Sequence, residues 1–153
     1  MKNPVTSFLI LNLALLFSCI SCNFAPGSYP YAERYEINCS ESDLILAVEK
    51  FKIDNPEFNL PVKTQLKDGR RDDNDHWYHV YFFYEKENVI FKTWIRRNGE
   101  KSTVLAFVAI NDGLILGNWM YINKDFSKGE NKIQKEKFER LIFEEVKKRI
   151  QRE

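Results

Sequence analysis

Residues 76–122 read HWYHVYFFYEKENVIFKTWIRRNGEKSTVLAFVAINDGLILGNWMYI, and this stretch decides the fold. It holds four runs that are rich in aromatic and β-branched residues, which favour β-strands. The expected strands span about 76–85, 89–97, 102–110 and 114–122. Because the runs follow one another with short gaps, each strand is expected to pair with the next.

Turn-forming residues occupy the three gaps between these strands. They are Glu87-Asn88, Asn98-Gly99 and Asn111–Gly113. Asn-Gly is the strongest short hairpin signal, because both central residues of a type I′ turn adopt positive φ. Asn-Asp-Gly suits a three-residue hairpin loop with glycine in the left-handed region. The stretch therefore predicts a four-stranded antiparallel meander.

A helix is expected on each side of the meander. The first should begin near Ser40, where an acid three residues later, at Asp43, gives a capping-box pattern, and it should end at Asn55-Pro56. The second should span about 130–150, with an apolar stripe at helical spacing. The order α-β-β-β-β-α predicts an α+β two-layer sandwich over residues 38–153.

The turns fix an expected register and therefore two faces of the sheet. With a turn centred on Asn98-Gly99, Ile95 should lie opposite Ser102 and Phe91 opposite Ala106. One face then forms the core beneath the helices: Val80, Phe82, Phe91, Ile95, Val104, Ala106, Val108, Ile110, Leu114, Leu116 and Met120. The opposite face carries Trp77, His79, Tyr81, Phe83, Lys92, Trp94, Arg96, Lys101, Leu105, Phe107, Trp119 and Tyr121.

Aromatic and basic side chains alternate on the second face. We define the aromatic–basic face as the following eight residues: Trp77, His79, Tyr81, Lys92, Trp94, Arg96, Trp119 and Tyr121. Such a surface can bind sugars, anions or another protein. Cross-strand aromatic and Lys/Arg pairs also stabilise sheets without binding anything, so the pattern favours a binding face without requiring one.

The charge balance excludes one class of partner. The 153 residues carry 23 Lys+Arg and 22 Asp+Glu. Loss of a signal segment containing Lys2 and no acid would leave 22 of each, so the mature chain would be formally neutral. Extensive nucleic-acid contact needs a basic excess, and none is predicted.

The first 22 residues, MKNPVTSFLILNLALLFSCISC, have the pattern of a secretory signal. Lys2 forms a short positive region, and an apolar run follows from Phe8 to Phe17, interrupted by Asn12. A bilayer span needs about 20 apolar residues, so this run is too short to be one. The segment is predicted to direct the chain out of the cytoplasm.

Residues 16–19, LFSC, resemble the lipobox of bacterial lipoproteins. That resemblance implies a diacylglyceryl group on Cys19, cleavage just before it, and attachment to a membrane through lipid. Cys22 is the alternative anchor, and an ordinary secretory signal is the alternative to both. The expected organisation is a signal peptide over 1–18, a tether over 19–37 rich in Pro and Gly, and the domain.

Two further expectations follow from the anchor. Cys22 and Cys39 could pair in an oxidising envelope if Cys19 carries the lipid. In lipoproteins of cells with two membranes, an acidic residue after the lipidated Cys tends to mark inner-membrane retention. Ile20 stands there, so the resemblance implies an outer-membrane protein that faces the periplasm.

The motifs of catalysis and metal binding are missing from the sequence. His76 and His79 are three apart on a predicted strand and should point to opposite faces. Residues 72–75, DDND, lack the Gly and distal Glu of an EF-hand loop. Gly-x-Ser-x-Gly and Gly-rich phosphate loops do not occur. We expect no enzyme activity, no metal and no cofactor.

The leading functional hypothesis is a non-catalytic, lipid-anchored protein of the cell envelope that binds a protein or another envelope component. The first alternative is an immunity-type lipoprotein that binds and neutralises a toxin. The second is a module that binds a small molecule or glycan, which needs Trp77, Trp94 and Trp119 on one open face.

The anchor generates the first testable prediction. Cys19→Ser should abolish metabolic labelling by fatty acid and release the protein from membranes, because the thiol that carries the lipid is gone. Cys22→Ser is the matched control and should keep the label. Full labelling of the Cys19 variant would move the anchor to Cys22 or elsewhere.

Overall fold

The computed structural model describes residues 28–150, and the predicted signal peptide, Cys19 and Cys22 lie outside them. The described chain has an α+β fold, as the sequence predicts. Its strands are β1 (Glu33–Ile37), β2 (Tyr78–Tyr84), β3 (Val89–Arg97), β4 (Thr103–Asp112) and β5 (Trp119–Tyr121). Its helices are α2 (Glu41–Asp54), α3 (Lys128–Phe138) and α4 (Glu144–Ile150).

The sheet has the strand order β1-β4-β3-β2, and β5 pairs with β4 on the same edge as β1. The predicted meander of four strands is therefore incomplete, because β1 was expected to belong to the tether. Tyr35 explains why this segment joins the sheet: its ring packs 4.7 Å from that of Phe143 and 5.6 Å from that of Phe138, centroid to centroid. Ile37 is also buried.

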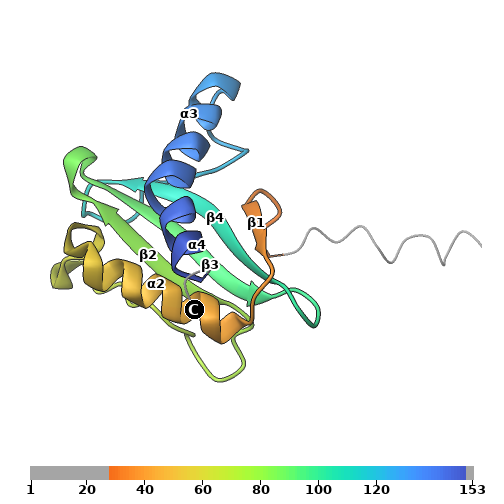
Figure 1. Ribbon diagram of the computed structural model, residues 1–153. Helices are drawn as coiled ribbons and strands as arrows, with labels where there is room; N and C mark the ends of the chain where they lie inside the picture. Colours follow the sequence, from red (N-terminus) through yellow and green to blue (C-terminus); the bar gives the residue numbers. More distant parts are fainter. Residues whose placement is uncertain (1–27, 151–153) are drawn as a thin grey trace, which may run out of the picture. The chain divides into compact units, whose positions relative to one another are not determined.

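Both helical segments cover one face of the sheet (Figure 1). The Ser40 hydroxyl accepts a hydrogen bond from the Asp43 N–H at 3.1 Å, and the Asp43 carboxylate accepts one from the Ser40 N–H. This capping box starts α2 where the sequence predicts. A second capping box, formed by Ser127 and Glu130, starts α3 slightly earlier than expected.

A π-helical turn over Glu139–Phe143 joins α3 to α4. Phe138, Ile142 and Val146 are fully buried and follow one another at intervals of four residues along the sheet side. The Phe138 ring stacks on Phe107 of β4 with centroids 4.4 Å apart. This stack fixes the long C-terminal helix against the centre of the sheet.

The register between β3 and β4 differs from the prediction. Ile95 lies opposite Leu105, three residues beyond the expected Ser102. Residues 98–102 form a wider loop in place of a two-residue turn, closed by a 2.8 Å hydrogen bond from the Asn98 N–H to the Ser102 carbonyl. An odd shift exchanges the two faces of a strand. The predicted facing of β4 was therefore wrong up to residue 107: Leu105 and Phe107 join the core, whereas Val104 and Ala106, expected there, lie on the opposite face.

A β-bulge then restores the predicted facing of β4. Thr93 lies opposite Phe107, but the preceding Lys92 lies opposite Ala109, so Val108 is the additional residue. Ile110 consequently faces the core, as expected. The turn at Glu87-Asn88 predicts Phe82 opposite Thr93, whereas Phe82 lies opposite Phe91. This difference of two residues leaves the facing unchanged: Val80, Phe82, Phe91 and Ile95 are all in the core.

The predicted fourth strand is much shorter than expected. Only Trp119–Tyr121 pair as β5, and residues 114–118 form a loop. Leu116 and Met120, expected in the core, are exposed. Leu116 lies outside the sheet because the buried side chain of Asn111 holds its loop, through hydrogen bonds donated to the carbonyls of Gly113 and Ile115.

Candidate binding surface

The residues of the aromatic–basic face lie together on the side of the sheet away from the helices. His79 lies opposite Trp94 across β2 and β3. Lys92 and Tyr121 both lie opposite Ala109, from β3 and β5 respectively. Directly opposed residues share a face of an antiparallel sheet. The members on β2 and β3 have the predicted facing despite the register error in β4, because these two strands kept their facing. Tyr121 has it because the bulge at Val108 restores the facing of Ala109, its partner on β4.

Two members of the aromatic–basic face are packing residues, which corrects the expectation of an open surface at these positions. The exposed fraction is 2% for His79 and 6% for Trp94. Trp94 lies opposite Ala106, and a large ring beside a small side chain can pack down onto the sheet. Neither residue is placed to touch a ligand. The alternative that needs Trp94 on an open face is correspondingly weakened.

The other members form an outer layer in which cations lie over aromatic rings. Lys92 Nζ is 5.4 Å from the centroid of the Trp119 ring, and the Trp119 ring is 6.4 Å from that of Tyr81. The Arg96 guanidinium is 5.7 Å from the centroid of Trp77. These distances are those of cation–π contacts. The Trp119 and Trp77 rings are thus each held next to a positive charge.

One further cation extends the same layer and was missed by the sequence analysis. Lys124 Nζ lies 5.4 Å from the ring of Tyr121 and 5.8 Å from the ring of Tyr31. Both rings are exposed. Tyr31 is visible in the sequence as an aromatic residue of the expected tether. The approach of Lys124, from the loop after β5, depends on the fold.

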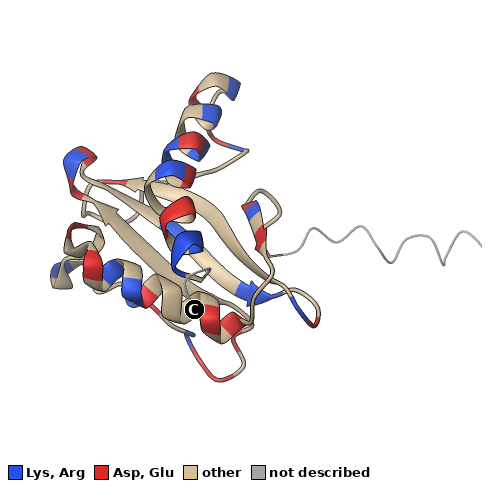
Figure 2. Cartoon of the chain, viewed as in Figure 1, with Lys and Arg blue, Asp and Glu red and all other residues tan. Residues whose placement is uncertain are grey.

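Two cations of the aromatic–basic face are not compensated by ion pairs within residues 28–150. Most charged residues lie on helices and loops, and the strands are mostly uncharged (Figure 2). On the helical side some cations are paired, among them Lys135 with Glu33 at 3.1 Å and Lys137 with Glu87. Among residues 28–150, by contrast, no ion pair forms to Lys92 or Arg96. Burial lowers the pKa of Lys92, and repulsion from Arg71 lowers it further.

The buried His79 fastens the 68–77 loop to the sheet. Its backbone N–H and C=O both bond to Gly69 at 2.9 Å. Its Nε2 lies 3.0 Å from Asp75 Oδ2, which also accepts from Arg71 Nε at 2.9 Å. Burial opposes ionisation of Asp75, but the hydrogen bonds from Arg71, Trp77 and His79 hold its pKa below the ordinary value.

The other ring nitrogen, His79 Nδ1, is buried without a hydrogen bond in the described part of the chain. Burial lowers the pKa of His79, and this outweighs the opposing attraction of Asp75. The neutral ring therefore donates to Asp75 through Nε2. Within residues 28–150, no hydroxyl or thiol is hydrogen-bonded to either ring nitrogen. The His79–Asp75 pair therefore has the geometry of a structural contact that holds the loop in place.

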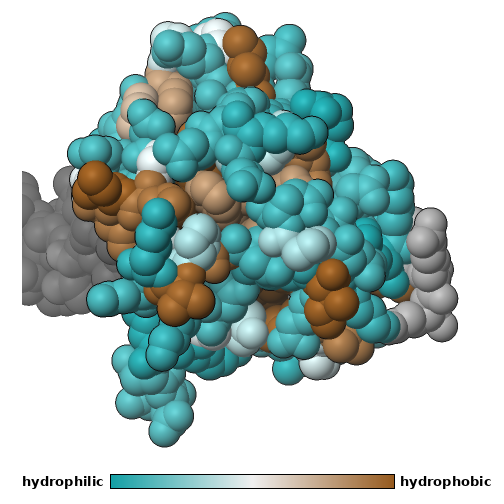
Figure 3. Space-filling view, turned by 90° about the vertical axis from the view of Figure 1, so that its left-hand side faces the viewer, coloured by the Kyte–Doolittle hydropathy of each residue, from teal (hydrophilic) through white to brown (hydrophobic). Residues whose placement is uncertain are grey.

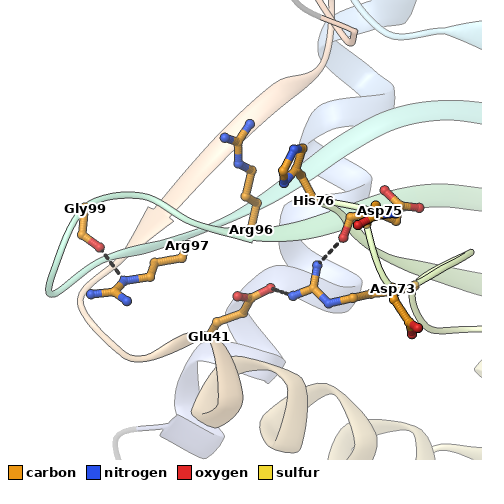
Figure 4. A pocket seen from close by; sticks show the side chains of 9 residues that line it. Glu41, Asp73, Asp75, His76, Arg96, Arg97 and Gly99 are labelled. Carbon is orange, nitrogen blue, oxygen red and sulfur yellow. Dashed lines mark hydrogen bonds and ion pairs between the residues drawn. The ribbon is translucent and has the colours of Figure 1, made fainter.

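An open cleft of about 690 Å³ adjoins the aromatic–basic face at Arg96 (Figure 4). It lies between the 70–76 loop, the start of α2 and the β3–β4 loop. Its lining consists of Glu41, Arg70, Asp73, Asn74, Asp75, His76, Arg96, Arg97 and Gly99. A second hollow of about 530 Å³ shares Glu41, Arg70 and Arg97 and continues to Cys39.

Cys39 is half-buried and forms no disulfide within residues 28–150. Burial raises its pKa, and the nearby Asp43 carboxylate raises it further. A raised pKa keeps the thiol protonated and makes it a weak nucleophile. Its predicted partner Cys22 lies outside the described residues.

Exposed apolar side chains are distributed over the surface. The side of the domain drawn in Figure 3 is mostly hydrophilic and carries several separate apolar patches. Val62 and Ile115 are among the most exposed apolar residues of the described chain. Across residues 28–150, no helix combines the length and apolar character needed to cross a membrane. No group of three or more His, Cys, Asp or Glu in that range is arranged to hold a metal ion.

Comparison with protein families, curated proteins and solved structures finds no match to this chain.

The difference in burial between two tryptophans gives a prediction. Trp94→Ala should lower the free energy of unfolding by about 3–5 kcal/mol, because it empties a packed site. Trp119→Ala should cost only about 1 kcal/mol, because the ring is half-exposed. Denaturant titration of both variants measures this. Equal losses would contradict the division into a buried and an outer layer.

The buried His79 predicts a pH dependence. Its pKa in the folded chain is below its ordinary value of 6.5, so the unfolded state binds the proton more tightly. The free energy of unfolding should fall as pH drops from about 7.5 to 5. Asp75 stays ionised throughout, since its pKa lies below 3.8.

His79→Gln should lose most of this dependence between pH 7.5 and 5. His76→Gln, in which an exposed ring is replaced, should retain it. Denaturant midpoints at the two pH values provide the measurement. An unchanged slope in the His79 variant would assign the effect to other groups.

Proposed function

We propose that the protein is a lipid-anchored protein of the cell envelope that binds a protein partner through the aromatic–basic face. Cys19 would carry the lipid, with Cys22 as the alternative. The anchor would hold the domain at a membrane, on the periplasmic side of an outer membrane where the cell has two. Binding would require no chemistry from the chain.

The observation that carries the proposal is the set of cations that lie over partly exposed rings without ion pairs. Lys92 and Arg96 are each held against a tryptophan, and no described carboxylate neutralises them. Trp, Tyr and Arg are the residues that most often dominate the energy of protein interfaces. A partner that presents acidic groups beside apolar ones would complete these contacts.

The shape of this surface favours a macromolecule over a small molecule. Small-molecule sites are concave and enclose most of the ligand. Trp119 and Tyr121 instead come from a short edge strand, and their rings lie on its outer side. A broad contact that spans β2, β3 and β5 would use all the outer members of the aromatic–basic face together.

Site-specific photo-crosslinking in cells tests the proposal. A photoreactive residue at Tyr121, which is 36% exposed, should trap a defined partner protein. The matched control is Ile133 on α3, which is 59% exposed on the helical side. Addition of Lys92→Gln to the Tyr121 probe should reduce the trapped product severalfold, because a contact cation is lost.

Two results would contradict the proposal. One is the absence of any protein adduct at Tyr121. The other is the same adducts, in the same yield, at Tyr121 and Ile133.

A further inference from the structure

We propose that the cleft beside Arg96 and Arg97 binds an acidic segment of the protein partner, through carboxylates that the two arginines hold. This inference rests on the proposed function, because it takes the partner to be a protein. It adds the chemistry of the bound segment and a second contact region, at the end of the aromatic–basic face.

Most acids of the cleft are already neutralised by the chain itself. Glu41 forms an ion pair with Arg70 at 2.7 Å. Asp75 is held by Arg71 and His79. These carboxylates therefore do not compensate the remaining cations of the cleft.

Arg96 and Arg97 form no ion pair with any carboxylate among residues 28–150. The Arg96 guanidinium lies against the Trp77 ring, which restricts its orientation. Arg97 donates from Nε to the Gly99 carbonyl at 2.7 Å, so both of its terminal nitrogens remain available. A guanidinium group held in this way offers paired N–H donors that match a carboxylate.

The remaining charged group of the cleft does not face these arginines. Asp73 comes from the loop on the other side of the cleft, and its carboxylate points away from Arg96 and Arg97 (Figure 4). The N-terminus of α2 contributes little to anion binding, because Ser40 and Asp43 already cap it. Arg96 and Arg97 are neighbours on β3 and their guanidinium groups point apart (Figure 4), so recognition is assigned to the two arginines through two different carboxylates of the segment.

The dimensions of the cleft favour a peptide segment. The cleft and the hollow that continues from it share Arg97 and Arg70, so a bound chain could pass from one to the other. Glu100 also lines the hollow, so the acidic residues of the segment are assigned to the cleft. A single phosphate would occupy only a small part of this space. A planar membrane surface does not fill a concavity between two loops and a helix end. An extended stretch that carries Asp or Glu fits both features.

The experiment uses the full chain in a zwitterionic detergent and a fluorescent peptide of six glutamates. Fluorescence anisotropy should show saturable binding at low ionic strength. The double variant R96Q/R97Q should weaken it at least tenfold. The control K86Q/K101Q removes the same charge from two exposed lysines that line neither cavity, and it should weaken binding less than threefold. Circular dichroism verifies that both variants are folded.

Four results would overturn the inference. The first two are no binding of hexaglutamate to the wild-type chain and equal weakening of binding in both double variants. The third is equal binding of a hexalysine peptide. The fourth is displacement of hexaglutamate, at matched ionic strength, by millimolar inorganic phosphate or by vesicles with anionic lipid. Each leaves the crosslinking result at Tyr121 unaffected, so failure of this site and failure of the proposed function are distinguishable.

Discussion

Burial of strand β4 on both faces is the constraint on which the other elements depend. All residues from Thr103 to Asn111 are buried. One edge of the strand pairs with β3, and the other pairs with both β1 and β5. A strand with no exposed side needs two covering layers. The helices supply one of them through the stack of Phe138 on Phe107, and large side chains of the sheet itself contribute to the other.

The composition of β4 makes its two faces different. Leu105 and Phe107 project toward the helices, whereas the opposite face carries small residues at Ala106 and Ala109. Large rings on neighbouring strands can pack over small side chains, and Trp94, which lies opposite Ala106, is buried. The β-bulge at Val108 keeps this asymmetry along the whole strand by returning Ile110 to the core. The outer aromatic layer is thus a consequence of how the central strand is packed.

Much of the fold could be predicted because local signals decide it. Ser40 and Asp43 form the capping box that the spacing indicates, and the strand composition locates β2, β3 and β4. The register could not be predicted, since Asn98-Gly99 is compatible with both a two-residue turn and the wider loop that forms. Strand β1 was missed because its pairing partner is far away in sequence.

The candidate site shows the same division. Membership of the aromatic–basic face followed from the alternation along β2 and β3, which a shift of two residues leaves intact. Burial of His79 and Trp94 did not follow, because it depends on the 68–77 loop and on Ala106. The cleft could not be predicted either, because its lining comes from segments that are distant in the chain, such as Glu41 and Arg97.

The central claim is that one face of the sheet is packed by helices and the other contacts a partner. Hydroxyl-radical footprinting tests it directly, by comparing the protein in intact envelopes with the purified chain. Trp119 and Tyr121 should be oxidised severalfold more slowly in envelopes, while Ile133 on the helical side should react equally in both. Equal oxidation of Trp119 and Tyr121 in the two preparations would contradict the account.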